Sequence, residues 1–115
     1  MVSFLILCAS LSVSDGDTLR CNNQTLRLLG SGIGIDAPDL RTPKCEKERD
    51  LARLARERLN QLIDGENVRI IAEGYDRDRH LLVNLYVNGR EIGRQLLDEG
   101  FAKERRSGET VEWCR

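Results

Sequence analysis

A single long segment of helical periodicity lies between two groups of strand-like runs, and this order restricts the fold more than any other feature of the sequence. Three runs precede the segment, at residues 4–14, 18–21 and 25–29, and two alternating runs follow it, at 68–72 and 81–87. A shorter apolar helix is expected around residues 92–97, before Gly100. The helical spacing between residues 42 and 64 is set by Leu51, Leu54, Ala55, Leu59 and Leu62.

Five strands are too few for a β-sandwich, and the order has no βαβ alternation. We therefore predict a β-rich α+β fold: a five-stranded OB-type barrel with a helix inserted after strand three and a second short helix near the C-terminus. Thr42-Pro43 is the expected start of the long helix and Gly65 its expected stop. We expect one domain over residues 1–115, a first barrel strand rather than a signal peptide at its start, and no membrane span.

The charge balance limits how the chain can bind an anionic polymer. It has 18 basic and 19 acidic residues and a net charge of −1. A protein that binds nucleic acid by backbone electrostatics alone is expected to be basic. Binding to a phosphate polymer would therefore have to be local, through a few arginines or a metal ion.

Four cysteines, an even number in a short chain, permit two disulfides in three connectivities. Zinc ligation is not indicated, because there is no CxxC motif and His80 is the only histidine. Two bridges in an oxidising compartment, or four buried reduced thiols, remain open from the residues alone.

Three short motifs bring acidic and basic side chains together: DGDT at residues 15–18, RLL at 27–29 and IDAPD at 35–39. Clustered carboxylates repel one another, and a hard cation such as calcium offsets that repulsion through oxygen ligands. An arginine nearby can form a bidentate contact with a phosphate. Each motif alone is also compatible with a plain turn, a helix cap or a surface arginine.

In this order, and followed by Asp76-Arg77 before LLVNLYVNG, the motifs closely resemble the staphylococcal nuclease (thermonuclease) family. The segment 45–49 and the ending Trp113-Cys114 resemble the cysteine-containing, secreted bacterial branch of that family. The resemblance implies an OB-type barrel and a calcium-dependent endonuclease. Its substrates would be single-stranded or frayed DNA and RNA. It also implies a monomer that is secreted or periplasmic, or cytoplasmic if the cysteines are reduced.

The resemblance implies a role for each matching residue. Asp17 and Asp36 would be calcium ligands, and Ala37 would add its backbone carbonyl. Arg27 would contact the phosphate and its developing charge. Asp39, which stands where the family usually has a glutamate, would activate the attacking water.

The chain departs from the family at a second catalytic arginine. The family's DRYGR stretch reads Asp76-Arg77-Asp78-Arg79-His80 here, so that His80 takes the arginine position. His80 as imidazolium could compensate in part, and Arg77 or Arg79 could substitute as phosphate contacts. The alternative is a catalytically degenerate OB-type module that binds nucleic acid or a protein; a structural or interaction domain without a nucleic-acid role is a third interpretation.

A second departure lies at residues 30–34, where the chain is about four residues longer than the family's RLLGIDAP. The glycines there predict a looped-out bulge that keeps Arg27 beside Asp36. A glycine-rich phosphate cradle is disfavoured, because neither a lysine nor a helix follows.

We predict that Cys45 pairs with Cys114, which would tie the tail to the start of the long helix. Cys8 is then expected to pair with Cys21 across adjacent strands.

Overall fold

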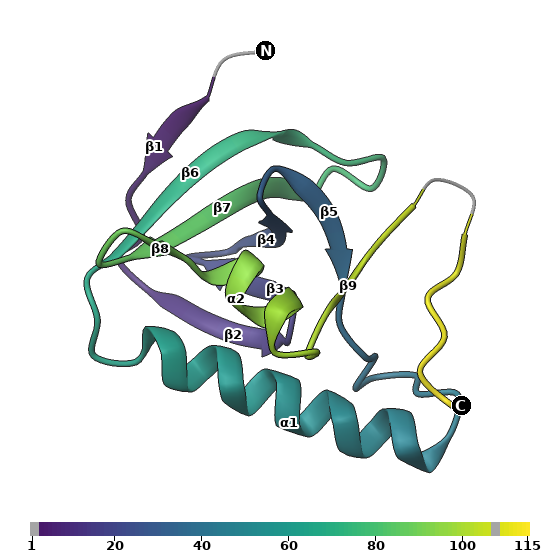
Figure 1. Cartoon of the computed structure of the whole chain (residues 1–115). Coiled ribbons are helices and arrows are strands. Elements are labelled where there is room, and N and C mark those ends of the chain that lie inside the picture. The colour runs from purple at the N-terminus through teal and green to yellow at the C-terminus, as the bar shows by residue number, and fades with distance from the viewer. Residues whose placement is uncertain (1–2, 107–108) are drawn as a thin grey trace.

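The computed structural model describes residues 3–106 and 109–115 (Figure 1). Nine strands and two helices are present in this described part. In chain order they are β1 (Phe4–Ile6), β2 (Leu11–Asp15), β3 (Thr18–Cys21), β4 (Gln24–Gly30), β5 (Ile33–Asp36), α1 (Glu46–Ile63), β6 (Val68–Tyr75), β7 (Leu81–Val87), β8 (Arg90–Glu91), α2 (Ile92–Asp98) and β9 (Lys103–Glu104). No helix in these residues is long and apolar enough to cross a membrane.

The main sheet runs in the order β1-β6-β7-β4-β3-β2. Its one parallel pair is β4 with β7, and every other neighbouring pair is antiparallel. Its two outer strands, β1 and β2, are consecutive in the chain, and no pairing between them closes the sheet within the described residues. The predicted class is confirmed: the fold is sheet-rich, consistent with an OB-type arrangement, with one helix after the first strands and one near the C-terminus.

The expected first strand, residues 4–14, is in fact two strands that pair with opposite edges of the sheet. The chain leaves strand geometry after Ile6. At Ser10 it is held by two hydrogen bonds to Asn22: the Asn22 N–H donates to the Ser10 carbonyl at 2.8 Å, and the Ser10 N–H donates to Asn22 Oδ1 at 3.2 Å. These bonds lie between the two halves of the segment, so that β1 pairs with β6 and β2 pairs with β3.

Helix α1 begins later than predicted. Cys45, not Thr42, is the N-cap, and its Sγ accepts the Glu48 N–H at 3.3 Å. Thr42 is not available as a cap because its backbone N–H and its hydroxyl both donate to Asp39. The expected stop is confirmed, since Gly65 follows the C-cap with φ of 72°.

The buried face of α1 is also rotated from the predicted one. Its buried positions are spaced three or four residues apart, as one helical stripe requires. They are Glu48, Ala52, Ala55, Leu59 and Ile63. Leu54, expected inside, is 52% exposed. The alanines of this stripe let the helix lie close to the β2–β3 turn, and leucines of the sheet such as Leu19, Leu26 and Leu85 complete the core.

The glycine-rich insertion is a hairpin rather than the predicted bulge. Strand β4 continues to Gly30, and β5 pairs back onto it with Gly30 opposite Ile33. The two turn residues, Ser31 and Gly32, have φ of 53° and 76°, as a type I′ turn requires. The chain therefore reverses instead of extending, and Asp36 returns toward Arg27.

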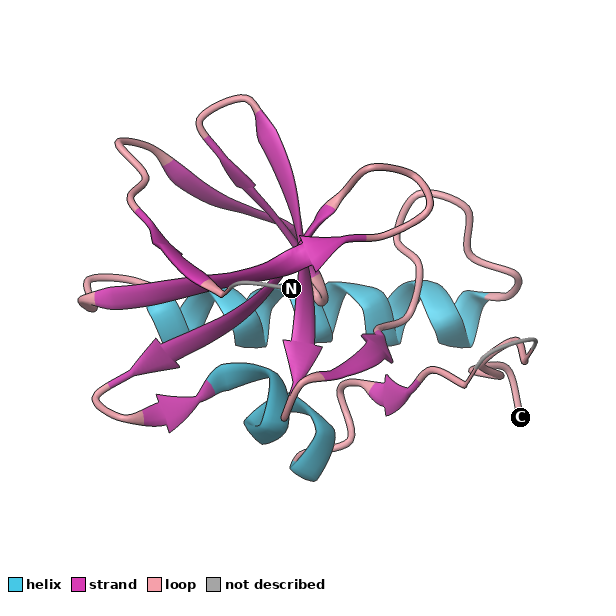
Figure 2. Cartoon of the chain, turned by 90° about the horizontal axis from the view of Figure 1, so that it is seen from above, coloured by secondary structure: helices cyan, strands magenta, loops and turns pink. Residues whose placement is uncertain are grey.

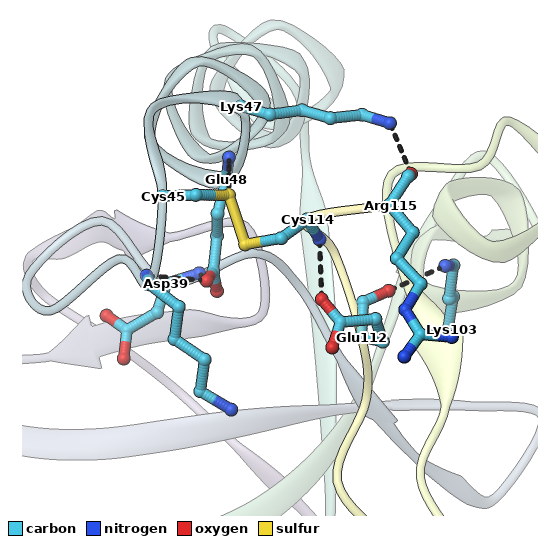
Figure 3. The surroundings of a disulfide bond; sticks show 9 residues. Asp39, Cys45, Lys47, Glu48, Lys103, Glu112, Cys114 and Arg115 are labelled. Carbon is cyan, nitrogen blue, oxygen red and sulfur yellow. Dashed lines mark hydrogen bonds between the residues drawn. A yellow bond between two sulfur atoms is a disulfide. The ribbon is translucent and has the colours of Figure 1, made fainter.

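Both predicted disulfides are present. Cys8 pairs with Cys21 and Cys45 with Cys114, with Cα atoms 5.3 Å and 6.1 Å apart. The second bridge joins the C-terminal tail to the start of α1 (Figure 3). Trp113, next to it, is 7% exposed, so the tail is anchored by both a covalent bond and a buried ring.

Candidate active site

The turn between β2 and β3 carries the first acidic residue of the site. Gly16 in this turn lies so close to its neighbours that an added Cβ would sit 2.6 Å from the Ala55 Cβ and 2.9 Å from the Ala37 Cβ. This contact presses the turn against α1 and against the segment that follows β5. As a result Asp17, which is 7% exposed, reaches that segment: its Oδ2 accepts the Ala37 N–H at 3.0 Å.

Arg27 on β4 joins the two acidic segments. Its Cα is paired with that of Thr18, one residue beyond Asp17. Its Nη2 lies 3.4 Å from Asp17 Oδ2 and 3.1 Å from Asp36 Oδ1. The structure therefore brings Asp17, Asp36 and Arg27 together, as the motif order predicts, despite the longer spacing between Arg27 and Asp36.

The carboxylates of this cluster repel one another, and two of them have raised pKa values. Burial raises the pKa of Asp36, and Asp17 raises it further, against the opposing effects of Arg105 and Arg27. Burial likewise raises the pKa of Asp15, with added repulsion from Asp17 and Asp39. A raised carboxyl pKa in the folded state means that the charged form costs stability above that pKa. A bound cation would offset that cost, and oxygen donors of this kind suit a hard divalent ion.

Asp39 is directed toward its own loop. Its Oδ1 accepts the N–H groups of Arg41 and Thr42 at 2.9 and 3.1 Å, and its Oδ2 accepts the Thr42 hydroxyl at 2.9 Å. Partial burial raises its pKa, but the hydrogen bonds from Thr42 and Arg41 outweigh this and the net shift is downward. Asp39 is therefore held ionised in a fixed orientation, with lone-pair capacity left on Oδ2.

Glu48, a charged residue on the buried stripe of α1, supports this loop. It is 5% exposed, and its carboxylate accepts the Asp39 N–H and the Lys44 N–H, both at 2.9 Å (Figure 3). Its position one turn before Ala52, on the stripe that the structure buries, is the signal that could have identified it.

His80 belongs to a separate turn. Its Nδ1 lies 3.2 Å from Asp76 Oδ2, and Asp76 Oδ1 accepts the N–H groups of His80 and Asp78. In the described part of the chain no hydrogen bond or ion pair joins His80 to Arg27, Asp17 or Asp36. Ligand atoms of Asp76, Asp78 and His80 lie within 4.8 Å of one another, but those of Asp76 already organise the turn.

The two other arginines predicted as phosphate contacts lie in the same turn. Arg77 and Arg79 are both exposed, and Arg79 has a left-handed φ of 65°. Arg77 borders a surface depression that also touches Gly34 and Arg105. The structure thus leaves Arg77 near the site and ties His80 to Asp76.

Arg105 is a further charged residue of the site, and no sequence motif marks it. It follows β9, which pairs with β5 so that Asp36 lies opposite Lys103. The Arg105 Nη1 lies 3.8 Å from Asp36 Oδ1. Only the tertiary pairing of β5 with β9 brings it there, so that periodicity in the tail could not have revealed it (Figure 1).

Comparison with known proteins identifies a family for most of the chain. The family model described as "Staphylococcal nuclease homologue" matches residues 26–112. A Haemophilus influenzae protein named "Uncharacterized endonuclease" is 29% identical over 96 residues, which cover 83% of this chain and 50% of that relative. The chain therefore spans about half the length of the relative it matches.

Proposed function

Because the chain belongs to the staphylococcal nuclease homologue family, we propose that it is a calcium-dependent endonuclease that hydrolyses phosphodiester bonds of DNA or RNA. The observation that carries the proposal is the convergence of Arg27 on Asp17 and Asp36, at 3.4 and 3.1 Å. A half-buried guanidinium shared by two carboxylates is also a common structural ion pair. The family match and the partial exposure of Arg27 and Asp36, 19% and 26% of their side chains, favour the catalytic interpretation.

The oxygen donors at the cluster fit a hard divalent cation. Asp17 and Asp36 would hold it with their carboxylates, and Ala37 with its backbone carbonyl. The hydrogen bond from the Ala37 N–H to Asp17 already keeps these residues adjacent. Calcium bound there would act as a Lewis acid toward a phosphate oxygen.

Arg27 and Asp39 would perform the remaining chemistry. Arg27 would donate two hydrogen bonds to the phosphate and stabilise its developing charge. Asp39 would orient a water and take its proton, while the water oxygen bonds to phosphorus and one P–O ester bond breaks. The departing oxygen would take a proton from solvent.

We further propose that the substrates are single-stranded or frayed strands and that the chain acts as a monomeric domain. A protein with a net charge of −1 is unsuited to binding many phosphates along a duplex, which favours a short local contact with the strand. Two disulfides are typical of proteins from oxidising compartments, so we expect a secreted or periplasmic protein.

The test is cleavage of labelled single-stranded DNA, RNA and plasmid in calcium and in chelator. We expect calcium-dependent cleavage that Asp36→Asn abolishes and that Arg27→Lys lowers by about 10²-fold, because lysine retains the charge without the fork. Asp98→Asn is the matched control, since Asp98 is exposed on α2 and pairs only with exposed Arg94 among the described residues. Absence of calcium-dependent cleavage at high enzyme concentration, or equal activity in the two asparagine variants, would reject the proposal.

A second candidate function is a non-catalytic OB-type module that binds nucleic acid or a protein. The observation that favours it is the contact between His80 and Asp76. His80 stands where the family has its second catalytic arginine, and this contact directs it toward Asp76 instead of the cluster. This candidate predicts that wild type binds single strands without cleaving them and that His80→Arg creates no activity.

A further inference from the structure

We propose that Arg105 is the second phosphate-binding arginine of this site, supplied by the segment after β9 rather than by the turn that holds His80. The proposal rests on the proposed nuclease function and assigns to that site a residue that no motif marks. Its chemical target is a phosphodiester oxygen of a single nucleic-acid strand.

Two guanidinium groups from different parts of the chain converge on one oxygen atom. Arg105 Nη1 lies 3.8 Å from Asp36 Oδ1, and Arg27 Nη2 lies 3.1 Å from the same oxygen. Arg27 is the more enclosed of the two, with 19% of its side chain exposed against 37% for Arg105. Arg105 therefore stands on the solvent side of the pair, where an anionic strand arrives first.

Arg105 is anchored through the strand that precedes it and through its own backbone N–H. Its N–H donates to the Gly34 carbonyl at 2.8 Å, directly after the β5–β9 ladder. Its side chain crosses Gly34, since a Cβ added there would lie 3.9 Å from Arg105 Nε. Further along, Trp113 is buried and Cys114 is bonded to Cys45 (Figure 3). Such anchoring keeps a guanidinium in place before substrate binds, which is what electrostatic stabilisation needs.

There is room for a strand next to Arg105. A surface depression of about 540 Å³ lies between Gly34, Arg105 and the turn that begins at Tyr75. Arg77 borders the same depression, and Tyr75 is 61% exposed, so a neighbouring phosphate and base have partners there. Asp76, Asp78 and Glu109 also line the depression, together with Arg77, Arg105 and Arg106. The Asp76 Oδ1 accepts backbone N–H groups of its own turn, which offsets part of its charge.

A purely structural role would make a different prediction. If Arg105 only neutralised Asp36, a cation on that carboxylate would replace it and the arginine would be dispensable in calcium. A phosphate-binding role requires the opposite, namely that Arg105 matters most when calcium and substrate are both present.

The experiment compares wild type with Arg105→Ala, Arg105→Lys and the control Arg94→Ala, an exposed arginine on α2. Cleavage of single-stranded DNA is measured in saturating calcium. Binding of a phosphorothioate dT oligonucleotide, which resists cleavage, is measured at several salt concentrations. Thermal unfolding confirms that each variant is folded.

We expect Arg105→Ala to lower kcat/KM by about 10²-fold and Arg105→Lys to recover part of that activity. The slope of log K against log salt should become shallower by about 0.7 in Arg105→Ala, because the protein then neutralises one phosphate fewer on the single strand. Arg94→Ala should stay close to wild type in both measurements.

The inference is overturned if Arg105→Ala cleaves single-stranded DNA and binds the oligonucleotide like Arg94→Ala. If wild type cleaves nothing, the proposed function fails by itself. The oligonucleotide slope then still decides whether Arg105 contacts phosphate.

Discussion

At the scale of single residues, the site depends on a position that has no side chain. The Gly16 Cα lies against Ala55 of the helix and Ala37 of the loop, and this contact sets where Asp17 points. The sequence could show that DGDT is a turn with carboxylates. It could not show that the turn is packed against a helix, because that contact is formed by residues about forty positions apart along the chain.

We predict that Gly16→Ala lowers the free energy of unfolding by about 1–3 kcal/mol, because the added methyl overlaps the Ala55 and Ala37 Cβ atoms. Calcium affinity should fall with it, since Asp17 is the next residue. Urea unfolding with and without calcium measures both effects.

The matched control is a double-mutant cycle with Ala55→Gly. Removing the Ala55 methyl should make the Gly16→Ala change less costly, even though glycine inside a helix itself costs about 1 kcal/mol. Strictly additive costs would show that the predicted overlap does not exist.

At the scale of elements, the sequence predicted strand and helix positions better than their pairing. Alternation at residues 81–87 and the helical period after residue 45 were sufficient to place β7 and α1. The helix start was wrong because Asp39 captures Thr42, a contact invisible to periodicity. The glycines at residues 30–34 indicated a break, but not that Ser31 would accept a left-handed φ and close a hairpin.

One ion pair connects α1 to the residue after α2, and its carboxylate, Glu99, titrates at a pH that can be reached by experiment. Arg58 of α1 donates to both carboxylate oxygens of Glu99, just after α2, at 2.7 and 2.9 Å. The hydrogen bond from Arg58 is the largest cause that lowers the pKa of Glu99, to about 2. A lowered carboxyl pKa adds stability above the unfolded value of 4.5, and that stability is lost as the pH falls toward 2.

We therefore predict that Glu99→Gln melts at a lower temperature than wild type at pH 7, and that the difference shrinks as the pH falls below 4.5. Glu57→Gln, which removes an exposed carboxylate of α1, should show little difference at either pH. A Glu99→Gln difference that stays constant between pH 7 and about pH 3 would contradict the assignment, because the pair would then contribute no linked proton.

At the scale of the whole molecule, the site is completed by the C-terminal segment, which returns to pair with β5. Figure 2 shows α1 running behind the strands, and Figure 1 shows the C-terminus beside the start of α1. The sequence predicted the convergence of Asp17, Asp36 and Arg27 because those residues lie in recognisable motifs. It predicted both disulfides from where the cysteines fall relative to the expected strands, helix and tail. It could not predict Arg105, since nothing local marks a tail that returns to pair with β5. The Cys45–Cys114 bridge is the covalent part of that return.

The last prediction compares the two bridges. Cys45 and Cys114 are 69 residues apart and Cys8 and Cys21 are 13 apart. From chain entropy alone the longer loop is worth about 4 kcal/mol and the shorter about 3 kcal/mol. Cys114→Ser should therefore lower the free energy of unfolding more than Cys8→Ser does, as measured in urea. Keeping Cys45 in place preserves the helix cap that its sulfur provides.

The variants should also differ in function, because only Cys114→Ser frees the tail that follows Arg105. Its cleavage rate and its salt dependence of binding should shift toward those of Arg105→Ala, while Cys8→Ser retains the wild-type values. Equal losses of stability would contradict the loop-length argument, whereas cleavage unchanged in Cys114→Ser would mean that the tail does not hold Arg105 at the site.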